Sequence, residues 1–155
     1  MAARVRASIE IDADVSDVFA FLDDPRHAIE LLPDLIEITD VERLANGGHR
    51  VRFTSVGRGG RVCEWESETI ERVPNELVVT RAATDRLTTI GRRELRELDG
   101  GTRLDGVVEY AVQMPLAALP LKPVTEFQMR RPMRRGLQAL LARIKARVES
   151  QRRRA

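Results

Sequence analysis

The sequence contains few of the residue types that define several common protein classes. Cys63 is its single cysteine among 155 residues, which excludes an internal disulfide framework and a zinc site built from several cysteines. No HExxH motif and no metal-ligand spacing of Cys and His occurs, so we expect neither a metal nor another cofactor. The longest apolar runs are far shorter than the roughly 20 residues that span a bilayer. Residues 1–12 lack the apolar segment of a secretory signal, so we expect a cytoplasmic protein.

Charge is distributed unevenly along the chain. Residues 1–129 hold 16 Arg and Lys residues against 23 Asp and Glu residues, whereas residues 130–155 hold 10 against one. This division indicates an acidic body with a basic C-terminal segment. At this length, with 43% hydrophobic and 32% charged residues, we expect one globular domain over residues 1–150 and a basic tail over 151–155.

The first third of the chain changes its hydrophobic period twice. Residues 4–12 alternate between apolar and polar side chains, which predicts a half-buried strand. An apolar stripe then follows at helical spacing and predicts a short helix that ends before Pro25. Its members are Val15, Val18, Phe19 and Leu22. A second short helix is expected over 25–32 and ends at Pro33.

Turn-forming residues divide the next segment into short strands. Gly, Asn, Asp and Pro clusters recur at hairpin intervals, which predicts six antiparallel strands. The expected ranges are 36–45, 49–56, 61–72, 76–82, 87–98 and 102–113. Several of these strands alternate polar with apolar side chains, so one face of their sheet needs a cover.

A long C-terminal helix supplies that cover. We expect it over about 125–150, with Pro132 either kinking it or marking its effective start. Its apolar stripe comprises Met129, Met133, Leu137, Leu140, Ile144 and Val148. The order predicts an α+β, helix-grip fold, in which a seven-stranded curved antiparallel sheet, two short helices and this long helix enclose a cavity.

Three segments carry a resemblance to a known family. IEIDADVSDVFAFLDDP at 9–25, LPDLI at 32–36 and GLQALLARIKARVE at 136–149 resemble the SRPBCC, or START-like, superfamily. This superfamily includes pollen-allergen-type proteins, polyketide cyclases and coenzyme-Q-binding proteins. Many members carry a Trp before the Pro that follows the second helix, whereas Leu31 and Leu32 precede Pro33 here. The resemblance implies the fold well and the function poorly, because this scaffold serves many ligands.

A cavity of this fold would be lined by inward side chains of the sheet and of the long helix. We expect the lining to contain Phe53, Trp65, Ser67, Arg81, Arg93, Val108, Tyr110, Met129 and Met133. Such a lining suits a flat or flexible apolar ligand. The alternative for the sole Trp, the sole Tyr and the two methionines is that they simply fill the core.

Arg81 and Arg93 are the most informative members of this set. Each lies on the same side of its strand as apolar neighbours that should face inward. A buried guanidinium needs an acidic or carbonyl partner. The alternative is a bulge that reverses the parity and places both arginines in solvent. In the cyclases that the chain resembles, inward Arg, Ser and Tyr residues orient the polyketide. The resemblance therefore implies Tyr110, Arg93, Arg81 and Ser67 as catalytic candidates, and His27, near the expected cavity mouth, is a candidate general base.

Three functions remain open from the sequence. The first is binding of a lipid, quinone or polyketide-like molecule in the cavity, and the second is polyketide aromatase/cyclase or dehydratase activity. The third is a quinone or lipid chaperone whose basic helix, Arg130–Arg154, contacts an anionic membrane or RNA. Because the apolar stripe of that helix is needed to close the sheet, a solvated helix is the alternative for its basic flank.

Overall fold

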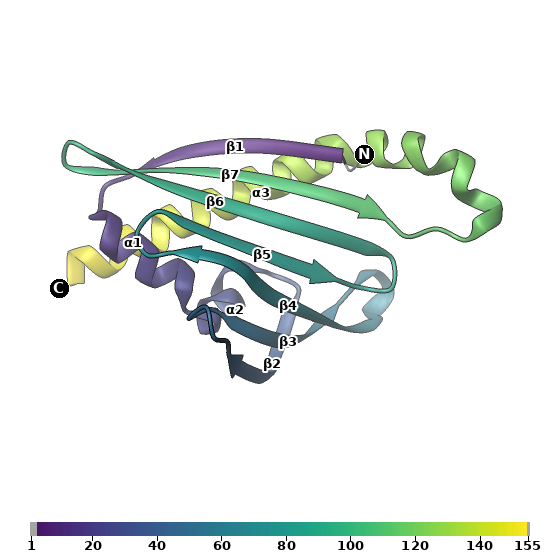
Figure 1. The fold of residues 1–155 in the computed structure, drawn as a ribbon, viewed down its shortest axis with the longest axis horizontal. Helices are drawn as coiled ribbons and strands as arrows, with labels where there is room; N and C mark the ends of the chain where they lie inside the picture. Colours follow the sequence, from purple (N-terminus) through teal and green to yellow (C-terminus); the bar gives the residue numbers. More distant parts are fainter. Residues whose placement is uncertain (1–2, 155) are drawn as a thin grey trace.

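A computed structural model of the protein describes residues 3–154, apart from the side chain of Arg58 (Figure 1). In chain order the elements are β1 (Ala3–Ile11), α1 (Val15–Asp23), η1 (Pro25–His27), α2 (Ala28–Leu31), β2 (Leu35–Arg43), β3 (His49–Val56), η2 (Arg58–Gly60), β4 (Val62–Val73), β5 (Leu77–Ala83), β6 (Leu87–Leu98), β7 (Gly101–Val112), η3 (Leu116–Leu121) and α3 (Lys122–Arg154). The predicted strands all form, with ends shifted by one or two residues.

One antiparallel sheet contains all seven strands, in the order β1-β7-β6-β5-β4-β3-β2. The long helix α3 runs behind the sheet and packs mainly on β1 and β7, whereas α1 and α2 lie near one end (Figure 1). We call the face toward α1 and α3 the inner face. The predicted helix-grip arrangement is confirmed.

The alternation in β1 and β7 explains how α3 attaches. Val5 and Ile11 on β1 and Leu104 and Tyr110 on β7 are each at most 1% exposed, while their polar neighbours face outward. Gly106 on β7 has no side chain to separate the layers, because a Cβ there would lie 3.1 Å from Cδ1 of Leu137 on α3. Strand alternation and one missing side chain therefore bring the helix onto this edge of the sheet.

The helix α3 is longer than the sequence predicts. It begins at Lys122, runs on through Pro132, and continues to Arg154, so residues 151–154 extend the helix. Its buried side, besides Glu126, is made of Leu137, Leu141, Ile144 and Val148.

Two separate hydrophobic clusters lie on the inner face. The larger one joins α1 and α3 to β1, β6 and β7. The smaller one contains Leu35, Val51 and Phe53 under α2. Since the clusters do not merge, the central strands between them carry less packing on their inner face.

An ion pair fixes α1 to the central strand β4. The Arg72 guanidinium donates two hydrogen bonds of 2.8 Å to the Asp23 carboxylate, and it lies 5.1 Å from the centre of the Phe19 ring. Both charged side chains are about four-fifths buried, and the hydrogen bonds that Arg72 donates to Asp23 raise the pKa of Arg72. This contact sets the position of α1 at the end of the inner face.

Candidate functional site

Polar and small side chains gather on the inner face between the two hydrophobic clusters. Ser67 on β4, Thr80 on β5, Thr89 and Arg93 on β6, and Val108 on β7 are all half-buried, although their strands lie inside the sheet. We call these five residues the open inner face. Residues in the middle of a covered sheet stay partly accessible only where the cover leaves room, so this surface is our candidate ligand site.

Strand register arranges the open inner face in rows. Ser67, Thr89 and Tyr110 belong to one cross-strand row, with Ala82 between Ser67 and Thr89. The next row contains Thr80 and Val108 on either side of Gly91, and the row after it contains Arg93 between Val78 and Gly106. The structure thus brings several hydroxyl groups and the Arg93 guanidinium onto one surface. The residues beside them in these rows include Ala82, Gly91 and Gly106, which have small side chains or none.

Arg93 is the inward arginine. None of the described residues places a hydrogen-bond acceptor or a carboxylate within bonding distance of its guanidinium, and burial lowers its pKa. Among the described residues, every fully enclosed side-chain nitrogen has a partner, so the unpaired guanidinium nitrogens of Arg93 border accessible space. A partly buried cation without a counter-ion is costly, and the N–H groups of Arg93 are free to donate hydrogen bonds to an anionic or carbonyl oxygen.

Trp65 and Phe53 form an aromatic pair at the other side of this surface. Their ring centres are 4.3 Å apart, and Nε1 of Trp65 donates a 2.7 Å hydrogen bond to Oγ of Ser55. Phe53 is 4% exposed and belongs to the small cluster, whereas Trp65 stays half-buried. Phe53 therefore acts as core, and Trp65 is the aromatic that remains accessible to a ligand.

The Tyr110 hydroxyl holds the start of α3 by a hydrogen bond. Its hydroxyl donates a 2.7 Å hydrogen bond to the Glu126 carbonyl, and the Glu126 carboxylate accepts a 2.9 Å hydrogen bond from the Val112 amide. Burial and, next, the Glu126 charge raise the pKa of Tyr110, while Arg130 opposes them. A hydroxyl in this position supports α3 and does not reach free space for proton transfer.

The remaining predicted residues lie at the edges of the site. Met129 and Met133 on α3 are half-buried and pack against the larger cluster, facing the sheet. His27 stacks on Phe21 with ring centres 4.0 Å apart, and its Nδ1 lies 3.4 Å from the Glu30 carboxylate. Its ring is thus held at the end of the fold where α1 and α2 meet.

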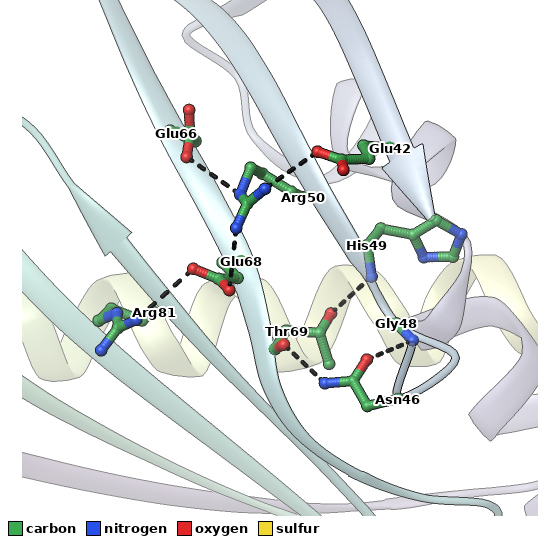
Figure 2. Close-up of polar contacts among 9 residues, drawn as sticks. All are labelled: Glu42, Asn46, Gly48, His49, Arg50, Glu66, Glu68, Thr69 and Arg81. Carbon is green, nitrogen blue, oxygen red and sulfur yellow. Dashed lines mark hydrogen bonds and ion pairs between the residues drawn. The ribbon is translucent and has the colours of Figure 1, made fainter. Parts of the chain in front are cut away.

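Arg81 faces outward, which corrects the expectation that it lines the cavity. It lies opposite Glu68 on β4, and their side chains form a 3.5 Å ion pair on the outer face (Figure 2). Arg50 continues this outer network, because its guanidinium also contacts Glu68, at 3.3 Å, together with Glu42 and Glu66. The carboxylates on β4 thus belong to a solvated charge network, as their alternation predicts.

Apolar residues do not mark the inner side of β5, for a local reason. Leu77, Val78 and Val79 are all buried, so burial does not identify the inner side of this strand. Val79 lies between Glu71 and Arg92 in the register, and these two side chains form a 3.8 Å ion pair that covers it from the outer side. Register along the β5–β6 pair runs without a shift, so a bulge in β5 is not the cause.

A polar hollow of about 680 Å³ lies on the outer face of the sheet, over β7 and its neighbours. Its charged side chains largely pair with one another: Arg92 with Glu94 at 2.7 Å, Arg103 with Asp105 at 3.1 Å, and Arg4 with Glu109. This hollow is on the opposite side from the predicted cavity. An enclosed cavity between the sheet and α3 stays a prediction.

Sequence reasoning left Thr80, Thr89 and two glycines near Arg93 out of the expected lining. Thr80 was not singled out, because the apolar run before it hides the parity of β5. Gly106 lies opposite Arg93 on β7 and Gly91 lies two residues before it on β6, and only the strand pairing reveals that both leave room around Arg93.

Metal and membrane-spanning features are not found in the part of the chain that the structure describes. No three His, Cys, Asp or Glu side chains within residues 3–154 gather as a metal site would require. None of the helices formed by these residues has the length and apolar character to cross a bilayer.

With the site described, comparison with known proteins identifies the family. The profile of a family described as polyketide cyclase / dehydrase and lipid transport matches residues 2–149. The chain therefore belongs to this family, which confirms the START-like resemblance. No curated protein matches the chain.

Solved structures of similar proteins share the fold at low sequence identity. The Zhui aromatase/cyclase from Streptomyces sp. R1128 superposes with a TM-score of 0.78 and 17% identity, covering 96% of this chain and 94% of that one. The di-domain ARO/CYC StfQ of the steffimycin biosynthetic pathway gives 0.76 and 15%, covering 97% of this chain and 52% of its own. A START superfamily protein from Mycobacterium smegmatis gives 0.70 and 16%, covering 96% and 98%. These TM-scores establish a common fold, and at such low identity they establish the fold alone.

Proposed function

We propose that the protein binds an aromatic or polyketide-like molecule on the open inner face, with Arg93 engaging an acidic or carbonyl oxygen of the ligand. The single observation that carries this proposal is the unpaired, desolvated guanidinium of Arg93 at the border of accessible space. Membership of the family and the likeness to aromatase/cyclases support the ligand class.

Electrostatics favour an oxygen-bearing ligand at this position. A guanidinium carries five N–H donors in a planar fork, so it matches a carboxylate, a phenolate or a pair of carbonyl oxygens. Gly91 and Gly106 place no side chain beside it, and Trp65 offers an accessible aromatic surface on the same side of the sheet. The ligand would therefore be flat and apolar, with an acidic or carbonyl end toward Arg93.

Catalysis of a cyclisation or dehydration is the second candidate function, and the position of Arg93 also favours it. A guanidinium that polarises a carbonyl makes the adjacent carbon more acidic, and the hydroxyls of Ser67 and Thr89 offer further hydrogen bonds to the chain. His27 remains the candidate for moving a proton. In this scheme Tyr110 acts as a positioning residue for α3, because its hydroxyl is already engaged.

Two naphthalene probes test the proposed function. The sole tryptophan, Trp65, reports binding through quenching of its emission during titration with 1-hydroxy-2-naphthoate or with 1-naphthol, which lacks the carboxylate. We expect Arg93→Met to weaken naphthoate binding roughly 10-fold or more, the usual worth of a hydrogen bond to a charged group, and to leave naphthol binding nearly unchanged.

Arg81→Met is the matched control, because it removes the same charge from the opposite face. It should bind both probes like the unmodified protein. Equal weakening of naphthoate by the two variants, or no effect of Arg93→Met, would show that Arg93 is not the anchor.

A further inference from the structure

Large apolar side chains are exposed together where η3 leads into α3. Leu116 is 83% exposed, Leu121 60% and Phe127 72%, and Leu119 and Val124 are also exposed. We call these five residues the apolar tip. In Figure 1 this green segment projects past the end of the sheet. Five large apolar side chains so close together on one protruding segment are more than a scattering of surface residues, and they indicate an interaction surface.

The apolar tip is distinct from the stripe that closes the sheet. Leu121, the last residue of η3, is followed at intervals of three residues by Val124 and Phe127, which share one side of the first turns of α3. Glu126 and Leu137, which are buried, occupy the other side. The apolar tip can therefore contact a partner without opening the fold, because its residues are not among those that α3 buries against the sheet.

The segment that carries the apolar tip is positively charged apart from one acid. Between residues 114 and 136 the cations are Lys122, Arg130, Arg131, Arg134 and Arg135, and the one acid is Glu126. Glu126 is 7% exposed and accepts its hydrogen bond from the Val112 amide, so it does not balance the surface charge. None of the four arginines forms an ion pair with any residue between 3 and 154. A second copy of the same tip would be repelled, and an anionic partner is favoured.

We propose that the apolar tip docks this protein on a bilayer that contains anionic lipids. Arg131 and Arg134 follow Phe127 by one and two turns on the same side of α3, about 6 and 10 Å along the axis. Apolar side chains of an interfacial helix reach about 5–10 Å into the boundary of headgroups and acyl chains, so the arginines would meet the phosphates. A protruding apolar segment also inserts more readily into the deformable surface of a bilayer than into the preformed groove of a protein.

Vesicle co-sedimentation with the full-length protein tests this proposal. Sucrose-loaded vesicles of POPC alone are compared with vesicles of POPC and POPG at 7:3, in 50 mM and 300 mM NaCl. We expect binding only to the POPG vesicles, weakened by salt, because each Arg or Lys near an anionic surface strengthens binding roughly fivefold.

Two pairs of variants locate the contact. Leu121→Ser with Phe127→Ser should lower the partition coefficient at least tenfold, and Arg131→Gln with Arg134→Gln should lower it to a similar extent. The controls are Val41→Ser, an exposed apolar residue on β2, and Arg153→Gln with Arg154→Gln at the far end of α3. Both controls should stay within about twofold to threefold of the parent, and all variants should keep its melting temperature.

Three results would overturn the proposal. One is absence of binding to POPG vesicles, which would leave an acidic protein surface as the occupant. Another is full binding by the Leu121→Ser and Phe127→Ser variant. The third is loss of binding through the Arg153 and Arg154 variant alone, which would place the contact on the C-terminal end of the helix.

Discussion

Tyr110 offers a pH-dependent test at the scale of a single residue. It is the sole tyrosine and is 1% exposed, and burial raises the pKa of its hydroxyl above the ordinary value of 10.0. Folding therefore favours the neutral phenol, so the unfolded chain loses this proton first as the pH rises. The free energy of unfolding should be unaffected by Tyr110 below about pH 10 and should fall above it.

Absorbance at 295 nm measures this directly, because only Tyr110 forms a phenolate. We expect a smaller phenolate fraction at pH 10 in the folded protein than in the urea-unfolded chain, and the remaining phenolate to appear together with loss of the far-UV circular dichroism as the pH rises further. A phenolate that titrates at pH 10 in the folded protein would mean that Tyr110 is accessible and free to act in catalysis.

We expect Arg93 to strengthen ligand binding and to lower the free energy of unfolding. Because its guanidinium is desolvated and unpaired, replacing it with an apolar side chain of similar length removes an uncompensated charge. We expect Arg93→Met to raise the free energy of unfolding by about 1 kcal/mol in urea denaturation. A clear loss of stability would contradict this account, because it would show that Arg93 has a structural partner in the folded protein.

At the scale of elements, one ion pair supplements the apolar packing that attaches α1. Asp23→Ala should remove both hydrogen bonds to Arg72 and leave a largely buried cation, so we expect a loss of about 1–3 kcal/mol in the free energy of unfolding. The exposed pair of Arg26 with Asp24 is the comparison, and Arg26→Ala should leave the melting temperature unchanged. Equal melting temperatures for the two variants would show that α1 is held by its apolar side alone.

The turn between β2 and β3 is a second element-scale feature that sequence alone only partly reveals. The Asn46 side chain caps it by accepting a hydrogen bond from Gly48 and donating one to the Thr69 carbonyl (Figure 2). A Cβ at Gly48 would lie 2.3 Å from Cβ of Thr69, so the turn needs glycine to approach β4.

Gly48→Ala should therefore destabilise the protein, by about 1–3 kcal/mol, because Thr69 or the turn must shift. Gly136→Ala is the opposite case, since nothing lies within 4 Å of a Cβ there and alanine is the better helix former. It should stabilise the protein by roughly 0.5–1 kcal/mol. Thermal unfolding of the two variants checks both signs, and a neutral Gly48→Ala would mean that the turn moves freely.

At the scale of the whole molecule, periodicity and turn residues were sufficient to predict the strands and helices. Each strand has a period of two or ends at a Gly, Asn or Pro turn, and α3 has one long apolar stripe. These are local signals, and the family resemblance supplied the arrangement. The extension of α3 before residue 125 was missed, because Pro123 and Pro132 are typical of helix ends.

The candidate site was predicted less completely, because it depends on pairing between strands. Arg93 was placed correctly by parity, whereas Arg81 was not, since Leu77 and Val79 are buried although they face outward, and an ion pair of Glu71 with Arg92 covers Val79. Tyr110 was expected in the site, and its bond to the Glu126 carbonyl involves a partner 16 residues away whose position no spacing rule fixes. Contacts of this kind are set by tertiary packing, which a single sequence does not encode locally.

The inner face and the outer hollow make different predictions for where a ligand sits, and a crystal structure of the complex with 1-hydroxy-2-naphthoate distinguishes them most directly. Our account predicts the naphthalene rings between the sheet and α3, with the carboxylate within about 3 Å of the Arg93 guanidinium. Naphthoate bound in the outer hollow beside Arg92 and Arg103, with Arg93 still unpaired, would contradict it.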